Sequence, residues 1–110
     1  MGKRTAELVP GTLDLLILTA LGDRTMHGYE LMEEIWSASG ELFRVDEGAL
    51  YPALHRLEAK GCLASEWGVS QANRKAKYYR LTPRGKKELA GARSGWQRLV
   101  LGMRRVMGEV

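Results

Sequence analysis

The spacing of apolar residues changes at Gly61, and this change limits the possible folds more than any other feature of the sequence. Before Gly61, apolar residues recur every three or four positions, which is typical of helices that bury one face. After Gly61, residues 62–67 and 74–81 follow a period of two, which is typical of strands. The polar segment GVSQAN between them predicts a turn. The pattern therefore predicts a mainly α-helical fold with a small β-hairpin.

Three helices are predicted before the hairpin. The first covers Thr12–Leu21, with Thr12 as its N-cap. The second runs from about residue 28 to residue 37 and has an apolar side and a side of glutamates. The third follows Asp46, a good N-cap residue, and stops at Gly61.

A further helix is predicted from Pro83 to about Met107, because Thr82 is a good N-cap and proline suits the first helical position. Its apolar residues step by three and four positions: Leu89, Ala92, Trp96, Leu99, Met103 and Val106. This spacing is that of a coiled-coil seam, about two and a half heptads long. We therefore expect a homodimer in which residues 83–110 form the dimerisation helix of each copy.

Charge is unevenly distributed along the chain, whose 110 residues suit one domain with a modest core. Residues 23–47 hold two cations and seven acids, whereas residues 74–105 hold eleven cations and one acid. The resulting net charges are −5 and +10, within a chain whose total is +4. A cationic block of this kind attracts nucleic acid or an anionic surface, although solvated helices also carry such faces.

Little in the sequence suits catalysis, metal binding or membranes. His27 and His55, the two histidines, fall in different helical segments, and neither a nucleophile elbow nor a glycine-rich phosphate loop is present. Cys62 is the single cysteine, which excludes an internal disulfide and suits a reducing cytoplasm. The start MGKRTAEL lacks a secretory signal, and no apolar run has the length of a membrane span. We expect a cytoplasmic protein that is not an enzyme, with no cofactor, no metal and no membrane partner.

Three helices followed by a β-hairpin, in about 70 residues, is the order of a winged helix-turn-helix. In that fold the third helix enters the major groove of DNA, and the hairpin touches the flanking backbone. Residues 1–82 are accordingly predicted to form a domain that binds double-stranded DNA. Leu50, Leu54 and Leu57 form the core stripe of the third helix, and the opposite side carries Ala49, Tyr51, Pro52, His55, Arg56 and Lys60.

The residue types on this face suggest separate roles. Arg56 can bond a guanine edge, Tyr51 and Lys60 suit phosphate, and His55 suits either. The alternative is that the face is only solvated.

The second strand of the hairpin, RKAKYYRL, combines core and surface positions. Tyr79 and Leu81 are predicted to pack inward, because they alternate with polar neighbours near the end of the strand. Arg74 lies at the predicted tip, where its length allows entry into a narrow minor groove. Lys75 and Lys77 are predicted to contact phosphates.

Three segments carry a resemblance to a known family: HGYELMEEI (27–35), GALYPALHRLEAKG (48–61) and NRKAKYYRLTPRGKKEL (73–89). In this order they resemble the PadR family of bacterial transcriptional regulators, in its short single-domain form. The resemblance implies a winged-helix dimer that binds an inverted-repeat operator, usually as a repressor, and is released by a small aromatic or drug-like effector.

The resemblance also implies roles for particular positions. It places His27, Gly28 and Tyr29 at the start of the second helix, Leu50, Tyr51 and Pro52 in the recognition helix, and Arg74, Lys75 and Tyr78 in the wing. His27 and Tyr29 are accordingly expected to contact DNA, together with the outer face of the third helix, Ala49 and Pro52 included, and the cations of the wing. One departure is Ala49, because the family often has Thr or Ser there. A hydroxyl group that can contact the DNA backbone is therefore missing.

Trp96 has two possible roles. It occupies a seam position, so it is first an aromatic residue of the predicted dimer core. In similar proteins an aromatic residue in this helix stacks on a planar effector. Small Ala92 leaves room beside it for a cavity, with Leu13 and Ile17 of the first helix as expected walls.

Other functional classes stay open at this point. A winged helix can serve as a protein-interaction module, with the acidic second helix meeting a basic partner. Nonspecific binding of DNA or RNA is a further alternative, and steep salt dependence without sequence preference would support it.

Overall fold

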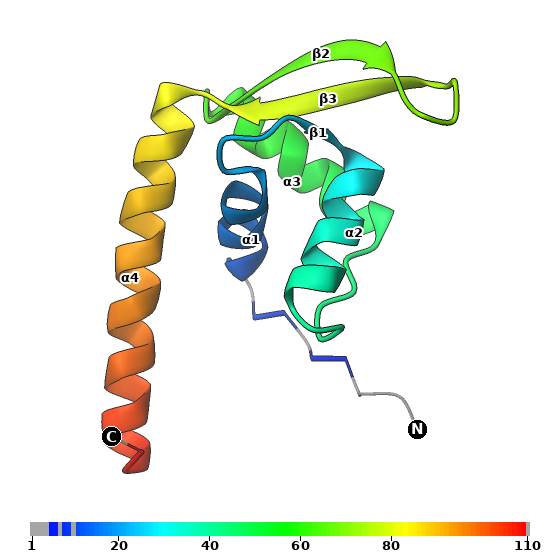
Figure 1. Cartoon of the computed structure of the whole chain (residues 1–110). Coiled ribbons are helices and arrows are strands. Elements are labelled where there is room, and N and C mark those ends of the chain that lie inside the picture. The colour runs from blue at the N-terminus through cyan, green and yellow to red at the C-terminus, as the bar shows by residue number, and fades with distance from the viewer. Residues whose placement is uncertain (1–4, 7, 10, 110) are drawn as a thin grey trace.

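The structure is a computed structural model that describes residues 5–6, 8–9 and 11–109. Its elements are α1 (Thr12–Leu21), β1 (Met26–His27), α2 (Gly28–Ala38), α3 (Glu47–Ala59), β2 (Leu63–Val69), β3 (Lys75–Leu81) and α4 (Pro83–Met107). Figure 1 shows α1, α2 and α3 gathered on one side of the small sheet, while α4 descends separately beside α1. The winged helix-turn-helix predicted from the sequence is confirmed.

Side-chain caps mark where α3 and α4 begin. The Ala49 amide donates to Asp46 Oδ1 at 2.9 Å at the start of α3, and the Gly85 amide donates to Thr82 Oγ1 at 3.0 Å at the start of α4. The prediction of Thr12 as N-cap is wrong. Gly11 holds that position with φ 90°, which glycine adopts readily, and Thr12 Oγ1 instead donates to the Val9 carbonyl.

The sheet has three antiparallel strands in the order β1-β3-β2. The hairpin pairs Leu63 with Leu81 at one end and Val69 with Lys75 at the other. It is longer than predicted, because residues 68 and 69 belong to β2 and not to the turn. The two-residue strand β1, which pairs with β3 through Met26 and Tyr79, was not predicted.

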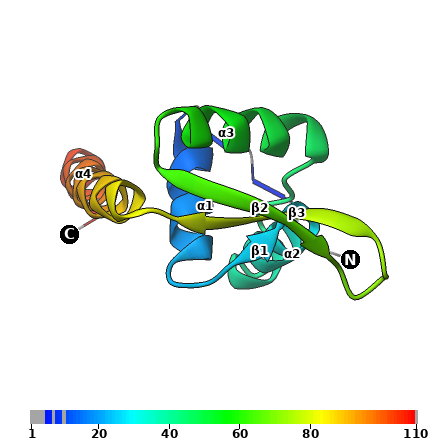
Figure 2. The same ribbon diagram turned by 90° about the horizontal axis from the view of Figure 1, so that it is seen from above.

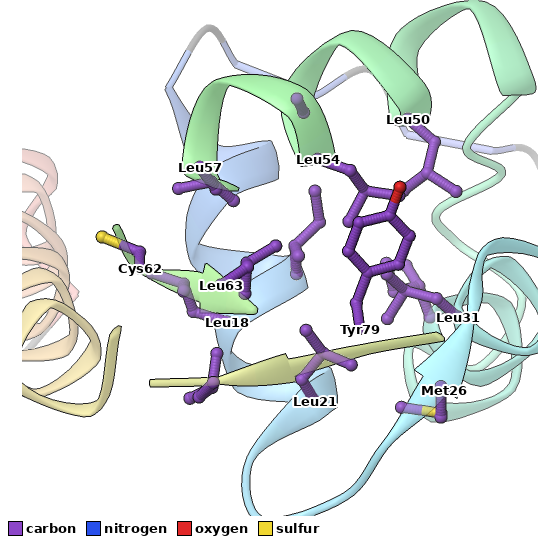
Figure 3. Close-up of a cluster of buried hydrophobic side chains, with 14 of the residues drawn as sticks. Leu18, Leu21, Met26, Leu31, Leu50, Leu54, Leu57, Cys62, Leu63 and Tyr79 are labelled. Atoms are coloured by element: carbon purple, nitrogen blue, oxygen red, sulfur yellow. The ribbon is translucent and has the colours of Figure 1, made fainter. Parts of the chain in front are cut away.

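The core lies between α3, α1 and the sheet. Figure 3 shows the ring of Tyr79 reaching from β3 toward Leu50 and Leu54 of α3. Tyr79 is 1% exposed and Leu81 is 8% exposed, so the predicted inward positions in this strand are confirmed. Burial raises the pKa of the Tyr79 hydroxyl. Because side chains alternate along a strand, Lys75 and Lys77 leave β3 on the same face as Tyr79.

The start of α4 is fixed against the end of α3 and the start of β2. Thr82 Oγ1 donates to the Gly61 carbonyl at 2.6 Å, and the Thr82 amide donates to the Cys62 carbonyl at 3.1 Å. Gly85, buried in the first turn of α4, lies so close to Cys62 that a Cβ atom there would overlap its carbonyl oxygen. The first turn of α4 is therefore fixed against the base of the hairpin.

Candidate nucleic-acid interface

The outer face of α3 is exposed as the sequence predicts. Leu50, Leu54 and Leu57 are buried at 2% exposure or less. The residues on the other sides of the helix are exposed: Ala49, Tyr51, Pro52, His55, Arg56 and Lys60. Figure 2 shows α3 along one edge of the molecule, with the hairpin of β2 and β3 projecting past α2. The protein thus offers an uncovered helix and a projecting wing.

Arg56 lies on the flank of α3 that faces α1. Its Nη2 atom is 2.5 Å from Oδ1 of Asp14, near the start of α1, and half of the Arg56 side chain remains exposed. Arg56 is therefore held in an ion pair that was not predicted from the sequence.

Tyr51 lies on the opposite flank, against the start of α2. A Cβ atom at Gly28 would be 2.5 Å from the Tyr51 hydroxyl oxygen, so a larger residue there would displace the ring from this position. The glycine of the HGYELMEEI segment thus has a packing role between α2 and α3.

His27 caps α2. The Glu30 amide donates to His27 Nδ1 at 3.2 Å, and the His27 amide donates to Glu30 Oε1 at 3.1 Å. The His27 ring also meets Tyr78 edge-on, with centroids 5.3 Å apart. These contacts give His27 a structural role, and its predicted contact with DNA stays a prediction. Tyr29 is exposed, and hydrogen bonding to Glu33, with the charge of that carboxylate, raises the Tyr29 pKa.

The wing cations have neighbours on the same sheet face. Lys75 Nζ lies 4.8 Å from the ring centroid of Trp67, whose side chain is 62% exposed. Lys77 Nζ lies 3.5 Å from Oε1 of Glu58, so this cation bridges β3 and α3. Arg74 is exposed at the end of the turn between β2 and β3, directly before β3 begins. Trp67 was not predicted as a site residue, although its alternation with Leu63 placed it on this face.

An open groove runs between α2, α3 and the wing. Seven of the eleven residues predicted to bind DNA line it: His27, Tyr29, Tyr51, His55, Arg74, Lys75 and Lys77. Ala49, Pro52, Arg56 and Lys60 do not line this groove. Glu30, Glu33 and Glu34 form part of its α2 wall. The negative charge on α2 leaves the α3 and wing side as the favourable approach for a polyanion.

The predicted effector residues have different environments. Ile17 is completely buried in the core, Leu13 and Ala92 are half-buried, and Trp96 is 43% exposed on α4. An effector wall at Ile17 would require the core to open, whereas Trp96 is directly accessible.

Glu58 makes a pH-dependent contribution to the stability of the fold. A hydrogen bond from Ser65 Oγ, 2.6 Å from Oε2, and the nearby charge of Lys77 lower the pKa of this carboxyl group. A lowered pKa contributes stability above the unfolded-state value, and this stability is lost as pH falls through the folded-state value.

We expect Glu58→Gln to reduce the free energy of unfolding by at most about 1 kcal/mol near neutral pH, because the pair is partly exposed. Urea unfolding from about pH 7 to about pH 3 measures this difference, which should shrink as Glu58 protonates in the parent protein. A difference that stays constant over this range would contradict the assigned cause.

Within the described residues, no helix is both long and apolar enough to cross a membrane, and no group of three metal-ligating side chains is found.

Comparison with known proteins identifies the family. A family model described as "Transcriptional regulator PadR-like family" matches residues 17–91. "Transcriptional regulator Rv3488" of Mycobacterium tuberculosis is 40% identical over 94 residues, which cover 86% of this chain and 81% of that protein.

Solved structures agree with this match. A PadR family transcription regulator from Clostridium difficile R20291 has a TM-score of 0.75 and 29% identity, covering 88% of this chain and 99% of that one. Bacillus subtilis PadR in complex with operator DNA has a TM-score of 0.66 and 25% identity, covering 74% of this chain but only 46% of that one. The family consists of transcription factors and not enzymes. The chain belongs to the PadR-like family of transcriptional regulators.

Proposed function

We propose that this chain is a cytoplasmic, homodimeric regulator that binds double-stranded DNA, represses genes with inverted-repeat operators and is released by a small hydrophobic or aromatic effector. The observation that carries DNA binding is the exposed outer face of α3 beside the cations of the wing. The solved complex of Bacillus subtilis PadR with operator DNA supports this assignment for a related fold.

In this proposal α3 lies in the major groove. His55 and Arg56 face the base edges, while Tyr51 and Lys60 lie toward the phosphates. The projecting wing reaches the flanking backbone through Lys75 and Lys77, and Arg74 enters the adjacent minor groove. The remaining face residues, Ala49 and Pro52, are small enough to allow close approach of the helix to DNA.

Dimerisation along α4 follows from the exposure of its apolar seam. Trp96 is 43% exposed, Leu99 and Met103 are each 55% exposed, and Val106 is 90% exposed. An apolar stripe of this length is costly in water, and a second copy would cover it. Leu89 and Ala92, at the start of the same seam, are already half-buried. Residues 83–110 would thus join two DNA-binding units.

Replacing Arg74 and Lys75 together with alanine tests the wing. We expect affinity for duplex DNA to fall on the order of tenfold at about 0.15 M salt, and the salt slope to fall by roughly two for each bound protomer, because each wing loses two cations that are directed at DNA. Fluorescence anisotropy with a labelled duplex, repeated at several salt concentrations, measures both quantities.

The matched control is Lys87→Ala with Arg93→Ala, which removes the same charge from exposed positions on α4. This control should leave the slope nearly unchanged. Equal losses in the two double variants would show that net charge, and not the wing, determines binding.

Trp96 offers a test of effector binding. Flat aromatic compounds that release the protein from DNA are expected to quench its fluorescence by stacking on the indole. In Trp96→Phe this quenching should be lost, and several-fold more compound should be needed for release. Trp67→Phe, which alters the wing tryptophan, is the control. If release from DNA leaves the tryptophan fluorescence unchanged in the parent protein and in both variants, the effector does not bind at Trp96.

A further inference from the structure

Two of the cations assigned to the DNA interface are each paired with a carboxylate. Arg56 pairs with Asp14 of α1, and Lys77 pairs with Glu58 of α3. The two pairs lie on opposite flanks of the recognition helix, one toward α1 and the other toward the wing. The acids are therefore placed where they reduce the positive field next to DNA.

The Asp14 pair leaves part of the arginine available. Asp14 engages Nη2, and a guanidinium group has five N–H donors, so the others can still reach a base edge or a phosphate. Asp14 is 26% exposed, whereas Arg56 is 50% exposed, so the acid lies deeper and the arginine lies outside it. This arrangement fixes where the guanidinium group sits and offsets its charge.

The Glu58 pair has its own support. Ser65 Oγ donates to Glu58 Oε2 at 2.6 Å, while Lys77 approaches Oε1 at 3.5 Å. The Lys77 ammonium also lies 5.8 Å from the Tyr79 ring centroid. Lys77 is thus held over the junction of α3 and β3, while about a third of its side chain stays exposed.

We propose that Asp14 and Glu58 are positioning residues that set DNA specificity, by holding Arg56 and Lys77 in place and weakening attraction to DNA of the wrong sequence. Nonspecific affinity depends almost entirely on phosphate neutralisation, and an internally paired cation contributes less to it. A correctly placed guanidinium group still discriminates bases by direct contact. The inference rests on the proposed DNA-binding function.

The test compares two duplexes of about 30 base pairs. One is the sequence that the parent protein recovers from random duplex DNA, and the other is the same composition in scrambled order. Asp14→Asn should tighten binding to the scrambled duplex roughly threefold at about 0.15 M salt and steepen its salt slope by about one for each bound protomer, because one cation is released in each. The ratio of the two affinities should fall by a similar factor or more. Glu58→Gln should act in the same direction through Lys77.

Three further variants separate positioning from bulk charge and from folding. Asp23→Asn removes the same charge from a pair with Lys86, 3.2 Å away at the α1 and α4 side, and should leave the ratio unchanged. Asp14→Glu, which keeps a carboxylate at this position, should have an affinity ratio for the two duplexes close to that of the parent protein. In an Arg56→Gln background, Asp14→Asn should not change the ratio of the two affinities any further.

The proposal is overturned if Asp14→Asn and Asp23→Asn have the same effect on the ratio of the two affinities. It is also overturned if Asp14→Asn still changes this ratio in the Arg56→Gln background. If the Asp14→Asn protein does not fold, the Glu58 pair gives the same comparison. The effect of Glu58→Gln is then measured in the parent protein and in a Lys77→Gln background. Failure of the parent protein to bind either duplex would instead contradict the proposed function.

Discussion

Gly85→Ala is expected to destabilise the protein by about 3 kcal/mol, near the upper end of the usual cost of overpacking. The new methyl group would overlap the carbonyl oxygen of Cys62, which is a backbone atom that cannot move without distorting β2. The Thr82 contacts to Gly61 and Cys62 hold the two segments at this distance. Denaturant unfolding followed by circular dichroism measures the loss.

Gly91→Ala is the matched control on the same helix. A Cβ atom at Gly91 meets no atom within 4 Å in this chain, so the substitution should stabilise the helix by up to about 1 kcal/mol through propensity alone. The two glycine variants should therefore change stability in opposite directions. Unchanged stability in Gly85→Ala would show that α4 does not pack against the hairpin base as described.

Ending the chain after Ser94 is expected to give a monomer that binds an inverted repeat on the order of a hundredfold more weakly than the full chain. The truncation removes the four most exposed seam residues, Trp96, Leu99, Met103 and Val106. Linking two DNA-binding units raises the effective concentration of the second unit, and this gain disappears in a monomer. Analytical ultracentrifugation and anisotropy with an inverted repeat and with a single half-site measure the two effects.

Binding to the single half-site should change little, because α3 and the wing are retained. Leu99→Glu in the full chain should reproduce the truncation, whereas Gln97→Glu, also an exposed position of α4, should not. A truncated chain that still sediments as a dimer would show that the interface lies elsewhere.

Much of the fold could be predicted because its signals are local. The bounds of α1 and the start of α4 follow from apolar periodicity and a proline at the first helical position. β1 could not be predicted, because two residues have no measurable period and its pairing with Tyr79 joins distant parts of the chain. Gly11 replaced Thr12 as the cap because its left-handed backbone geometry is not visible in the sequence.

The sequence predicted which side of α3 is exposed, but it did not predict which residues the exposed side chains contact. Periodicity identified which side of α3 is exposed, since a single core stripe determines the opposite side. The pairing of Arg56 with Asp14 joins residues 42 positions apart and depends on how α1 packs against α3. The capping role of His27 depends likewise on the geometry at the start of α2, where its ring nitrogen accepts the Glu30 amide.

Selection of bound fragments from random duplex DNA by the purified full chain tests the central claim most directly. The account predicts enrichment of an inverted repeat whose half-sites are centred about one helical turn, or a multiple of it, apart, because two α3 helices enter successive major grooves on one side of the duplex. The Arg74 and Lys75 double variant should recover the same sequence with lower yield. Recovery of fragments without any shared sequence, or failure to retain duplex DNA at all, would contradict the account.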